Sequence, residues 1–223
     1  MSAPAPLQPR DSYHHGDLRQ ALLAAGIELA RQGGPDAVVL REATRRVGVS
    51  PNAAYRHFED REALLAAVCD AAQATLATAI DEEFFAVTST EPGPMAIGHL
   101  RAVGTRYVRF ALDEPGFFRT AFSVPVNLDD AALPTRAGPR GRTPFELLGD
   151  SLDELVAAGL MPASRRPQAE FLAWSSVHGL AMLLIDGPLR AFPRAQADAV
   201  TQRVVDMVVA GFTAPAADAN SAG

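Results

Sequence analysis

A short polar segment in the first third of the chain carries side chains suited to contacts with DNA. Asn52 offers an amide that can pair with an adenine edge through one donor and one acceptor, and the small Ala53 can approach a thymine methyl group. Tyr55, His57 and Arg61 can donate hydrogen bonds to phosphate oxygens, which positions a protein on DNA without reading its sequence. The chemistry predicted here is therefore recognition of a nucleic acid.

The candidate DNA interface extends beyond these five residues. Arg41 stands at the start of a predicted helix whose N-terminus would face the DNA backbone, whereas Arg45 and Arg46 fit ordinary exposed charges better. The residues expected to contact DNA are Arg41, Ser50, Pro51, Asn52, Ala53, Tyr55, Arg56, His57 and Arg61.

Two short helices joined by a tight turn must position these side chains. The first is expected over residues 41–47, and Gly48 permits the turn because glycine tolerates a left-handed backbone. The second is expected over residues 51–58, with Ser50 as a favoured N-cap whose side chain accepts a backbone N–H, and proline at its first position. Ala54, with the phenylalanine four residues later, should face inward. This arrangement predicts a helix-turn-helix, whose second helix enters the major groove.

Helical periodicity continues along most of the chain. One helix is expected from His15 to Gln32, and Asp60 is expected to cap a long helix that runs to about Phe85. The segment Val124 to Arg142, rich in proline, glycine and arginine, is typical of a mobile loop. The sequence predicts an all-α protein of about nine helices. The remaining helices are expected at Met95 to Leu112, Pro115 to Ser123, Pro144 to Leu160, Gln168 to Ile185 and Arg194 to Phe212.

Charge is distributed unevenly along the 223 residues, whose net charge is −6. Met1 to Glu62 balances eight arginines against eight acidic residues, so the whole deficit lies beyond it. Within Arg41 to Arg56 there are four arginines and one glutamate. A small cationic face on an acidic body weakens non-specific DNA binding and leaves more of the affinity to specific contacts.

No run approaches the roughly 18 apolar residues of a membrane span, and the N-terminus lacks the pattern of a signal peptide. The single cysteine, Cys69, cannot form an internal disulfide. These observations predict a cytoplasmic protein with no membrane partner.

Four stretches together form a recognisable pattern: Tyr13-His-His-Gly-Asp-Leu-Arg, Leu40-Arg-Glu, Val47-Gly-Val-Ser-Pro and Tyr55-Arg-His-Phe-Glu-Asp-Arg-Glu-Ala-Leu-Leu. Over Tyr13 to Val68 the sequence closely resembles the tetracycline-repressor (TetR) family of bacterial regulators. A shorter stretch, Trp174-Ser-Ser-Val-His178-Gly179, resembles the Trp-x-x-x-His-Gly motif of one C-terminal subclass.

The resemblance implies a three-helix DNA-binding module, a long linking helix, a helical ligand-binding domain and a homodimer joined by the last two helices. The expected division is a disordered arm over residues 1–12, a DNA-binding domain over 13–60, a ligand-binding and dimerisation domain over 61–213, and a disordered tail over 214–223. The expected function is a transcriptional repressor that a small hydrophobic effector of unknown identity releases from a palindromic double-stranded DNA operator.

Four positions depart from the family pattern. Ala43 and Thr44 stand where family members usually have a branched apolar residue and then alanine. Val39 stands where a serine or threonine usually caps the second helix, so this helix is expected to start late or fray. Thr44 places a hydroxyl near the crossing of the two helices, where close packing is expected. Arg61 replaces the usual lysine and keeps the expected phosphate contact.

The effector site is expected in an apolar cavity between helices. An acidic body around an apolar cavity favours a neutral or cationic hydrophobic effector. Most of the aromatic residues must belong to the core, and Arg106 is a further polar candidate. The residues proposed to line the cavity are Phe84, His99, Tyr107, Phe110, Phe118, Phe122, Trp174, His178 and Met182.

No metal or other cofactor is expected. Neither His99 nor His178 has a second ligand three or four residues away, and no cysteine lies near either, so each is interpreted as a half-buried histidine with an ordinary hydrogen bond.

Dimer contacts are expected on the last two helices, whose apolar faces are extensive for surface helices. The alternative is that these faces only cover the core of one protomer. The proposed dimer residues are Phe171, Leu172, Val204, Val205, Val208 and Phe212.

Two other classes of protein stay open at this point. An enzyme is disfavoured because the sequence has no Glu-x-x-His pair, phosphate-binding glycine loop or nucleophile elbow. The other alternative is a helical protein-interaction module or ligand-binding bundle that does not bind DNA. DNA affinity that falls steeply with salt would separate a DNA-binding protein from both.

Overall fold

The computed structural model describes residues 15–124 and 128–214. Within these residues the chain forms nine α-helices, four short 3₁₀ helices and no strand, which confirms the predicted all-α class. The α-helices are α1 (His15–Gly33), α2 (Leu40–Val47), α3 (Pro51–Ala54), α4 (Arg61–Ala86), α5 (Pro92–Asp113), α6 (Pro115–Ala121), α7 (Pro144–Ala157), α8 (Ala169–Ile185) and α9 (Arg194–Thr213). The 3₁₀ helices are η1 (Pro35–Ala37), η2 (Leu128–Ala132), η3 (Pro134–Arg136) and η4 (Ala163–Arg165).

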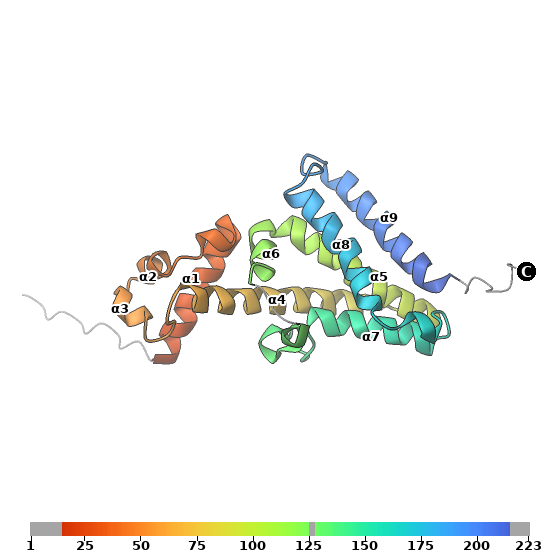
Figure 1. Cartoon of the computed structure of the whole chain (residues 1–223), viewed down its shortest axis with the longest axis horizontal. Helices are drawn as coiled ribbons and strands as arrows, with labels where there is room; N and C mark the ends of the chain where they lie inside the picture. Colours follow the sequence, from red (N-terminus) through yellow and green to blue (C-terminus); the bar gives the residue numbers. More distant parts are fainter. Residues whose placement is uncertain (1–14, 125–127, 215–223) are drawn as a thin grey trace, which may run out of the picture.

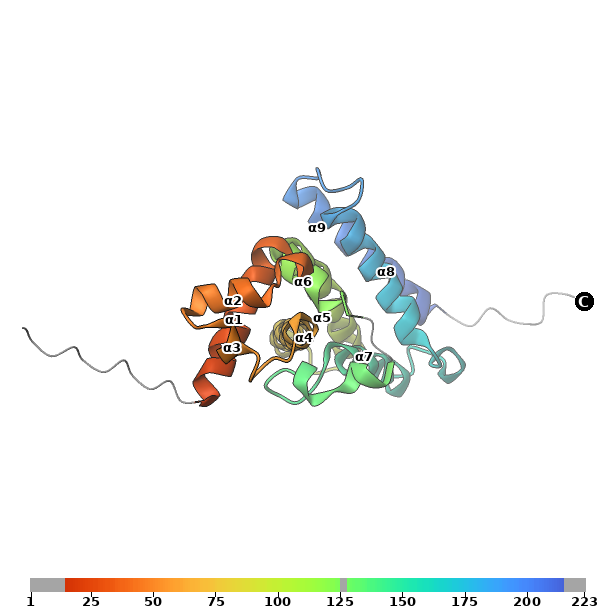
Figure 2. The ribbon, with the colours of Figure 1, turned by 60° about the vertical axis from the view of Figure 1, so that its left-hand side comes forward.

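The helices form a small head and a larger body, joined by α4 (Figure 1). Helices α1, α2 and α3 make the head at one end of the molecule, and α5 to α9 gather around the distal part of α4. Viewed along α4, the head helices lie on one side of it while α5, α6 and α7 cover other sides (Figure 2). Each helix predicted from periodicity is present, and α3 differs most because it ends at Ala54 rather than near Phe58. The expected disordered arm, 1–12, lies outside the described residues, as does the expected tail, 214–223, apart from Ala214.

Helix α4 begins where the sequence predicts, because the Asp60 carboxylate accepts a hydrogen bond from the backbone N–H of Ala63 at 2.7 Å. Its 26 residues span about 39 Å at 1.5 Å per residue. The helix has buried residues along its whole length, from Leu64 to Phe84, since the head and the body cover it in turn. It is therefore the element that can carry a displacement in the body to the head.

One feature of α4 corrects an expectation from the sequence. Among the described residues, this one helix contains an 18-residue window with a mean hydropathy of 1.6, which by length and composition alone would suffice to cross a membrane. The apolar residues are interrupted by few charges because α4 packs against α1, α5, α6 and α7. Its apolar composition is thus accounted for by packing within the protein.

The segment between α6 and α7, expected from its composition to be a mobile loop, has local structure and ion pairs in its described part. Where it is described, it includes η2 and η3 and is held against α4 by two acidic residues of that helix. Asp70 accepts hydrogen bonds from Thr135 Oγ1 and Arg136 Nε, both at 2.8 Å, and Asp81 pairs with Arg142 at 2.6 Å. This segment, rich in proline and glycine, is therefore held against α4 by ion pairs and hydrogen bonds between side chains, and not by the backbone hydrogen bonds of a sheet.

Candidate DNA interface and effector cavity

The exposed face of α3 and of the turn that follows it carries the side chains predicted to read DNA. Ala54 and Phe58 are buried as expected, which turns Asn52, Tyr55 and Arg56 outward into solvent. Tyr55 is 56% exposed, unusually open for a large aromatic side chain. This face lies at the end of the head farthest from the body (Figure 1). None of the residues that the structure describes therefore obstructs its approach to a flat or grooved partner.

The turn between α2 and α3 has the geometry that the sequence predicts. Gly48 adopts φ 75° and ψ 29°, a left-handed conformation that favours glycine. The backbone N–H groups of Gly48 and Val49 both donate to the carbonyl oxygen of Thr44, at 2.9 and 3.1 Å. The Thr44 hydroxyl, buried at the helix crossing, donates to the carbonyl of Arg41 at 2.7 Å. Because this hydroxyl is satisfied within its own helix, it does not disturb the crossing.

Both helix starts differ in detail from the expectation. Helix α2 begins at Leu40, so Val39 does not delay it although it provides no side-chain cap. Ser50 occupies the N-cap of α3, but its hydroxyl makes no capping hydrogen bond; the backbone N–H of Ala53 instead donates to the Ser50 carbonyl at 3.0 Å. The exposed Ser50 side chain thus stays available to an outside acceptor or donor.

The arginines of α2 divide into two kinds. Arg45 and Arg46 both donate to Glu42, and Arg46 also donates to Gln32 at 2.7 Å. The hydrogen bond from Arg45 is the main cause that lowers the pKa of Glu42 to about 2. Arg41, in contrast, is exposed in the first turn of α2. The intrahelical pairing agrees with the interpretation of Arg45 and Arg46 as surface charges.

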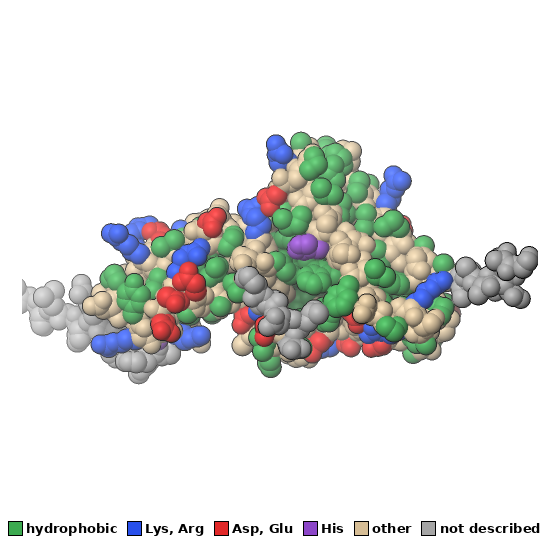
Figure 3. Space-filling view, in the orientation of Figure 1, with side chains coloured by type: hydrophobic (Ala, Val, Ile, Leu, Met, Phe, Trp, Pro, Cys, Tyr) green, Lys and Arg blue, Asp and Glu red, His purple; other side chains and the backbone are tan. Residues whose placement is uncertain are grey.

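Arg61 and His57 follow the exposed residues Asn52, Tyr55 and Arg56 in the chain and are not fully exposed themselves. A terminal nitrogen of Arg61 donates to the carbonyl oxygen of Pro35 at 2.8 Å, so part of this guanidinium ties α4 to η1. His57 is half-buried in the turn after α3. Figure 3 shows blue arginine side chains at this end of the molecule, interspersed with red carboxylates.

A cavity of about 270 Å³ lies in the body between α4, α5, α7, α8 and α9. Its volume is close to the lower end of the roughly 300 to 1,000 Å³ that is typical of small-molecule sites. In Figure 3, hydrophobic side chains gather around a hollow in the middle of the face shown. The lining residues are Gln73, Ile80, Leu100, Val103, Gly104, Tyr107, Phe122, Ala131, Arg136, Pro144, Phe145, Leu148, Ala173, Trp174, Val177, Val205 and Val208.

Three of the nine predicted cavity residues, Tyr107, Phe122 and Trp174, do line it. The other six do not line it, and the rings among them pack against other aromatic rings. Phe84 stacks on His99 with ring centroids 3.9 Å apart, and His99 Nδ1 lies 2.6 Å from the Glu154 carboxylate. The predicted residues that do not line the cavity are Phe84, His99, Phe110, Phe118, His178 and Met182.

His178 does not line the cavity, but it is hydrogen-bonded to Tyr107, which does. Trp174 Nε1 donates to the Tyr107 hydroxyl at 2.9 Å, and that hydroxyl lies 2.8 Å from His178 Nδ1. Burial raises the pKa of the Tyr107 hydroxyl and lowers the pKa of His178, so both groups are neutral near pH 7. The three side chains therefore satisfy one another, as expected for a histidine in an ordinary hydrogen bond.

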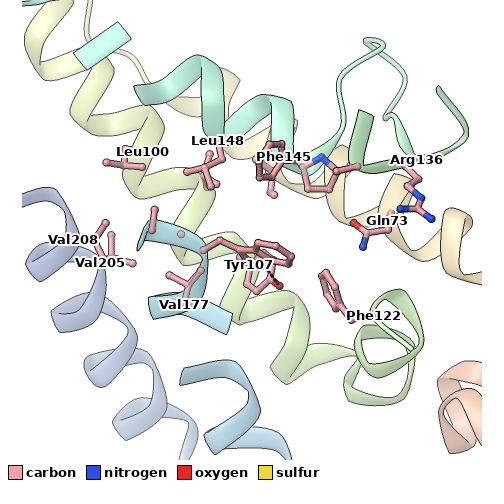
Figure 4. A pocket seen from close by; sticks show the side chains of 17 residues that line it. Gln73, Leu100, Tyr107, Phe122, Arg136, Phe145, Leu148, Val177, Val205 and Val208 are labelled. Atoms are coloured by element: carbon pink, nitrogen blue, oxygen red, sulfur yellow. Dashed lines mark hydrogen bonds between the residues drawn. The ribbon is translucent and has the colours of Figure 1, made fainter. Parts of the chain in front are cut away.

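Two polar residues that the sequence analysis did not single out, Gln73 and Arg136, lie at one end of the cavity (Figure 4). Gln73 Nε2 donates to the carbonyl of Ala121 at 2.9 Å. The sequence holds a signal for Gln73, a polar residue seven positions before Ile80 on an apolar helix. It holds none for Arg136, whose placement depends on its pairing with Asp70.

The candidate dimer residues separate into three groups by exposure. Phe171 and Leu172 on α8 are exposed, at 38% and 64%, while Val204 and Val208 on α9 are half-buried. Val205 and Phe212 correct the expectation, because both are buried in the protomer's own core. Helix α9 turns Val205 toward α5, where a Cβ added at Gly104 would lie 3.0 Å from its side chain.

The fold and the site together define a class of protein: a helical regulator with a helix-turn-helix head and a cavity-bearing body. Family comparisons agree with this definition. Residues 22–68 match the model of bacterial regulatory proteins of the TetR family, and residues 100–208 match that of the tetracyclin repressor-like C-terminal domain. The chain belongs to the TetR family and is a DNA-binding transcriptional regulator, a transcription factor rather than an enzyme.

Solved structures share the fold over nearly the whole chain. A protein of unknown function from Rhodococcus sp. RHA1 is 26% identical, with a TM-score of 0.69 over 92% of this chain and 100% of that one. A TetR-family regulator from Pectobacterium atrosepticum is 19% identical, with a TM-score of 0.63 over 92% and 99%. A TetR variant from Acinetobacter baumannii AYE, in complex with minocycline, is 20% identical, with a TM-score of 0.57 over 86% and 94%. No curated protein gives a significant match.

Proposed function

We propose that this regulator binds a near-palindromic operator as a homodimer and leaves it when a small, largely apolar effector fills the cavity. The observation that supports operator binding is the outward face of α3 and of the turn after it. Asn52, Tyr55 and Arg56 are exposed together, while Ala54 and Phe58 anchor the helix to the head. Asn52 is assigned to an adenine edge, and Tyr55 and Arg56 to the phosphates beside it.

The proposed dimer surface is the exposed side of α8 and α9. Leu172, Leu183 and Met207 are 64%, 44% and 61% exposed, which is uncommon for large apolar side chains. Gly179 and Gly211 open onto empty space, so a partner helix could approach closely there. Pairing these helices with their symmetry mates gives a four-helix interface and places two heads on one side of the dimer. The heads would then reach successive major grooves, about 34 to 36 Å apart.

The proposed control depends on α4 because both halves of the protein contact this helix. Asp60 caps it directly after the head, while Gln73 and Ile80 on the same helix line the cavity. An effector that prefers the conformer with misplaced heads would lower operator occupancy by mass action. A differential affinity of roughly 5.5 kcal/mol would convert an almost fully competent dimer into an almost fully incompetent one.

This proposal divides the chain into a DNA-binding domain over residues 13–60 and a ligand-binding and dimerisation domain over 61–213. Because the partner is chromosomal DNA, the site of action is the bacterial cytoplasm. We propose that the protein acts as a repressor. In this scheme the effector displaces the heads from the operator, and the loss of bound protein relieves repression.

Selection of bound sequences from a random DNA pool tests the proposed operator binding. The expected product is a palindrome with half-sites one helical turn apart. Asn52→Ala should flatten the preference at one position of each half-site by about 1 to 3 kcal/mol. Gln196→Ala removes an exposed amide from the start of α9 and should leave the selected sequence unchanged. Recovery of no consensus sequence would contradict the proposal and favour a helical interaction module.

A further inference from the structure

The structure assigns the chemical class of the effector, an inference that rests on the proposed effector function of the cavity. We infer that the cavity takes a molecule with an apolar body and a terminal oxygen acceptor, a carbonyl or carboxylate, held by Arg136. Of the neutral or cationic effector expected from the sequence, this assignment keeps the neutral form, excludes the cationic one and adds an anionic one.

Arg136 is the one charged side chain among the residues that line the described cavity. Its side chain is 8% exposed and comes from η3, where Asp70 on α4 accepts from Nε at 2.8 Å. Among the described residues no hydrogen-bond partner is found for its two terminal NH₂ groups. Buried guanidinium groups with spare donors favour planar oxygen acceptors, which can bind two parallel N–H groups.

Most of the other polar lining atoms are already engaged. Trp174 Nε1 donates to the Tyr107 hydroxyl, and that hydroxyl is hydrogen-bonded to His178. Gln73 commits one N–H to the Ala121 carbonyl and lies beside Arg136 at the same end (Figure 4). Among the described residues, a ligand donor would therefore find the neutral Gln73 Oε1, whereas a ligand acceptor would find the charged guanidinium of Arg136.

The opposite end of the cavity is apolar. Leu100, Val205 and Val208 close it, far from Arg136 along the length seen in Figure 4. A cationic effector head at the Arg136 end would meet a like charge, and at the other end it would be buried without a partner. The arrangement thus disfavours a positively charged head group and orients the ligand with its oxygen acceptor toward Arg136.

Three probes with the same chain length test this assignment: octanoate, octanamide and 1-octylamine. Trp174 is the one tryptophan in the sequence and lines the cavity, so its fluorescence reports occupancy in the DNA-free protein. Octanoate or octanamide should bind at least about tenfold more tightly than 1-octylamine. The ratio of the first two affinities shows whether the acceptor is charged.

A pair of arginine variants separates recognition from structure. Arg136→Gln should lose the preference for the acceptor probes. Arg142→Gln removes an arginine from the same segment, also paired with an acidic residue of α4 but absent from the cavity lining, and should keep that preference. If Arg136→Gln fails to fold, the ranking of the three probes on the unmodified protein still decides.

The assignment is overturned if 1-octylamine binds as tightly as octanoate and octanamide, if none of the three changes the Trp174 emission, or if both variants lose the preference equally. A gel shift without ligand tests DNA binding independently. If the protein binds an operator but shows no preference for octanoate and octanamide over 1-octylamine, this inference is contradicted. The proposal that the protein binds an operator then still stands.

Discussion

The hydroxyl of Tyr107 on α5 lies 2.8 Å from Nδ1 of His178 on α8. Trp174 Nε1 can only donate, so the hydroxyl accepts from Trp174 and directs its own proton to His178. This order requires the neutral histidine with its proton on Nε2. The Trp-x-x-x-His spacing on α8 therefore places two ring nitrogens around one buried phenol.

Protonation of His178 should destabilise the fold. Because burial lowers its pKa, the unfolded chain takes up this proton first, near its ordinary pKa of about 6.5. The stability linked to His178 is fully present above about pH 6.5 and is lost as the pH falls from there to the folded-state pKa. Urea midpoints at several pH values between 7.5 and 5 should decline, and His178→Asn should show a shallower decline. Equal slopes in both proteins would contradict this account.

Tyr107→Phe should destabilise the body by about 1 to 3 kcal/mol, because the Trp174 N–H and His178 Nδ1 would lose their buried partner. Tyr55→Phe is the matched control, since Tyr55 is largely exposed and should stay within about 0.5 kcal/mol of the parent. Chemical denaturation measures both. Comparable losses in the two variants would mean that the hydroxyl of Tyr107 contributes nothing specific.

Gly116 joins the body to the head by close backbone contact. A Cβ added there would lie 2.4 Å from the carbonyl oxygen of Ala30 and 2.7 Å from that of Arg31, both at the end of α1. Gly116→Ala should therefore push α6 away from the head, with a cost of about 1 to 3 kcal/mol and an altered operator affinity.

The control for this change is Gly149→Ala within α7, where the added Cβ meets only ordinary contacts. That variant should be neutral or stabilised by up to about 1 kcal/mol, since alanine is the better helix former. Thermal unfolding and gel shifts on both variants test the pair. An unchanged melting temperature in Gly116→Ala would show that the contact yields without cost.

Arg56→Ala should weaken operator binding at low salt and reduce the slope of log affinity against log salt by about 1, as expected for one lost phosphate contact. Arg190→Ala removes the same charge from the turn between α8 and α9, far from the head (Figure 1), and should keep the slope. Filter binding over a series of salt concentrations measures the slope for both variants and the parent. If both variants shift the slope equally, Arg56 acts only through net charge.

Leu172→Glu should shift the protein from dimer to monomer, because it places a charge on the exposed apolar side of α8. Leu133→Glu changes an exposed leucine away from α8 and α9 and should leave the mass unchanged. Sedimentation velocity distinguishes the two states. A Leu172→Glu protein that remains dimeric would place the interface elsewhere.

Local signals in the sequence were sufficient to predict the head. Gly48 marks a left-handed turn, Pro51 opens a helix and Asp60 caps another, and each depends only on residues within one or two turns. The same signals left the hydroxyl of Ser50 misassigned, since a cap position does not fix a side-chain rotamer.

The sequence by itself determined the helices, their order and which side chains of residues 51–58 face solvent, because periodicity and capping are properties of neighbouring residues. Only the tertiary structure decided which apolar residues surround empty space. Val205 and Met207 are two positions apart on α9, yet one meets α5 and the other meets solvent. Arg136 is buried because Asp70, 66 residues earlier, compensates its charge. Such contacts join residues distant in sequence, and no local pattern specifies them.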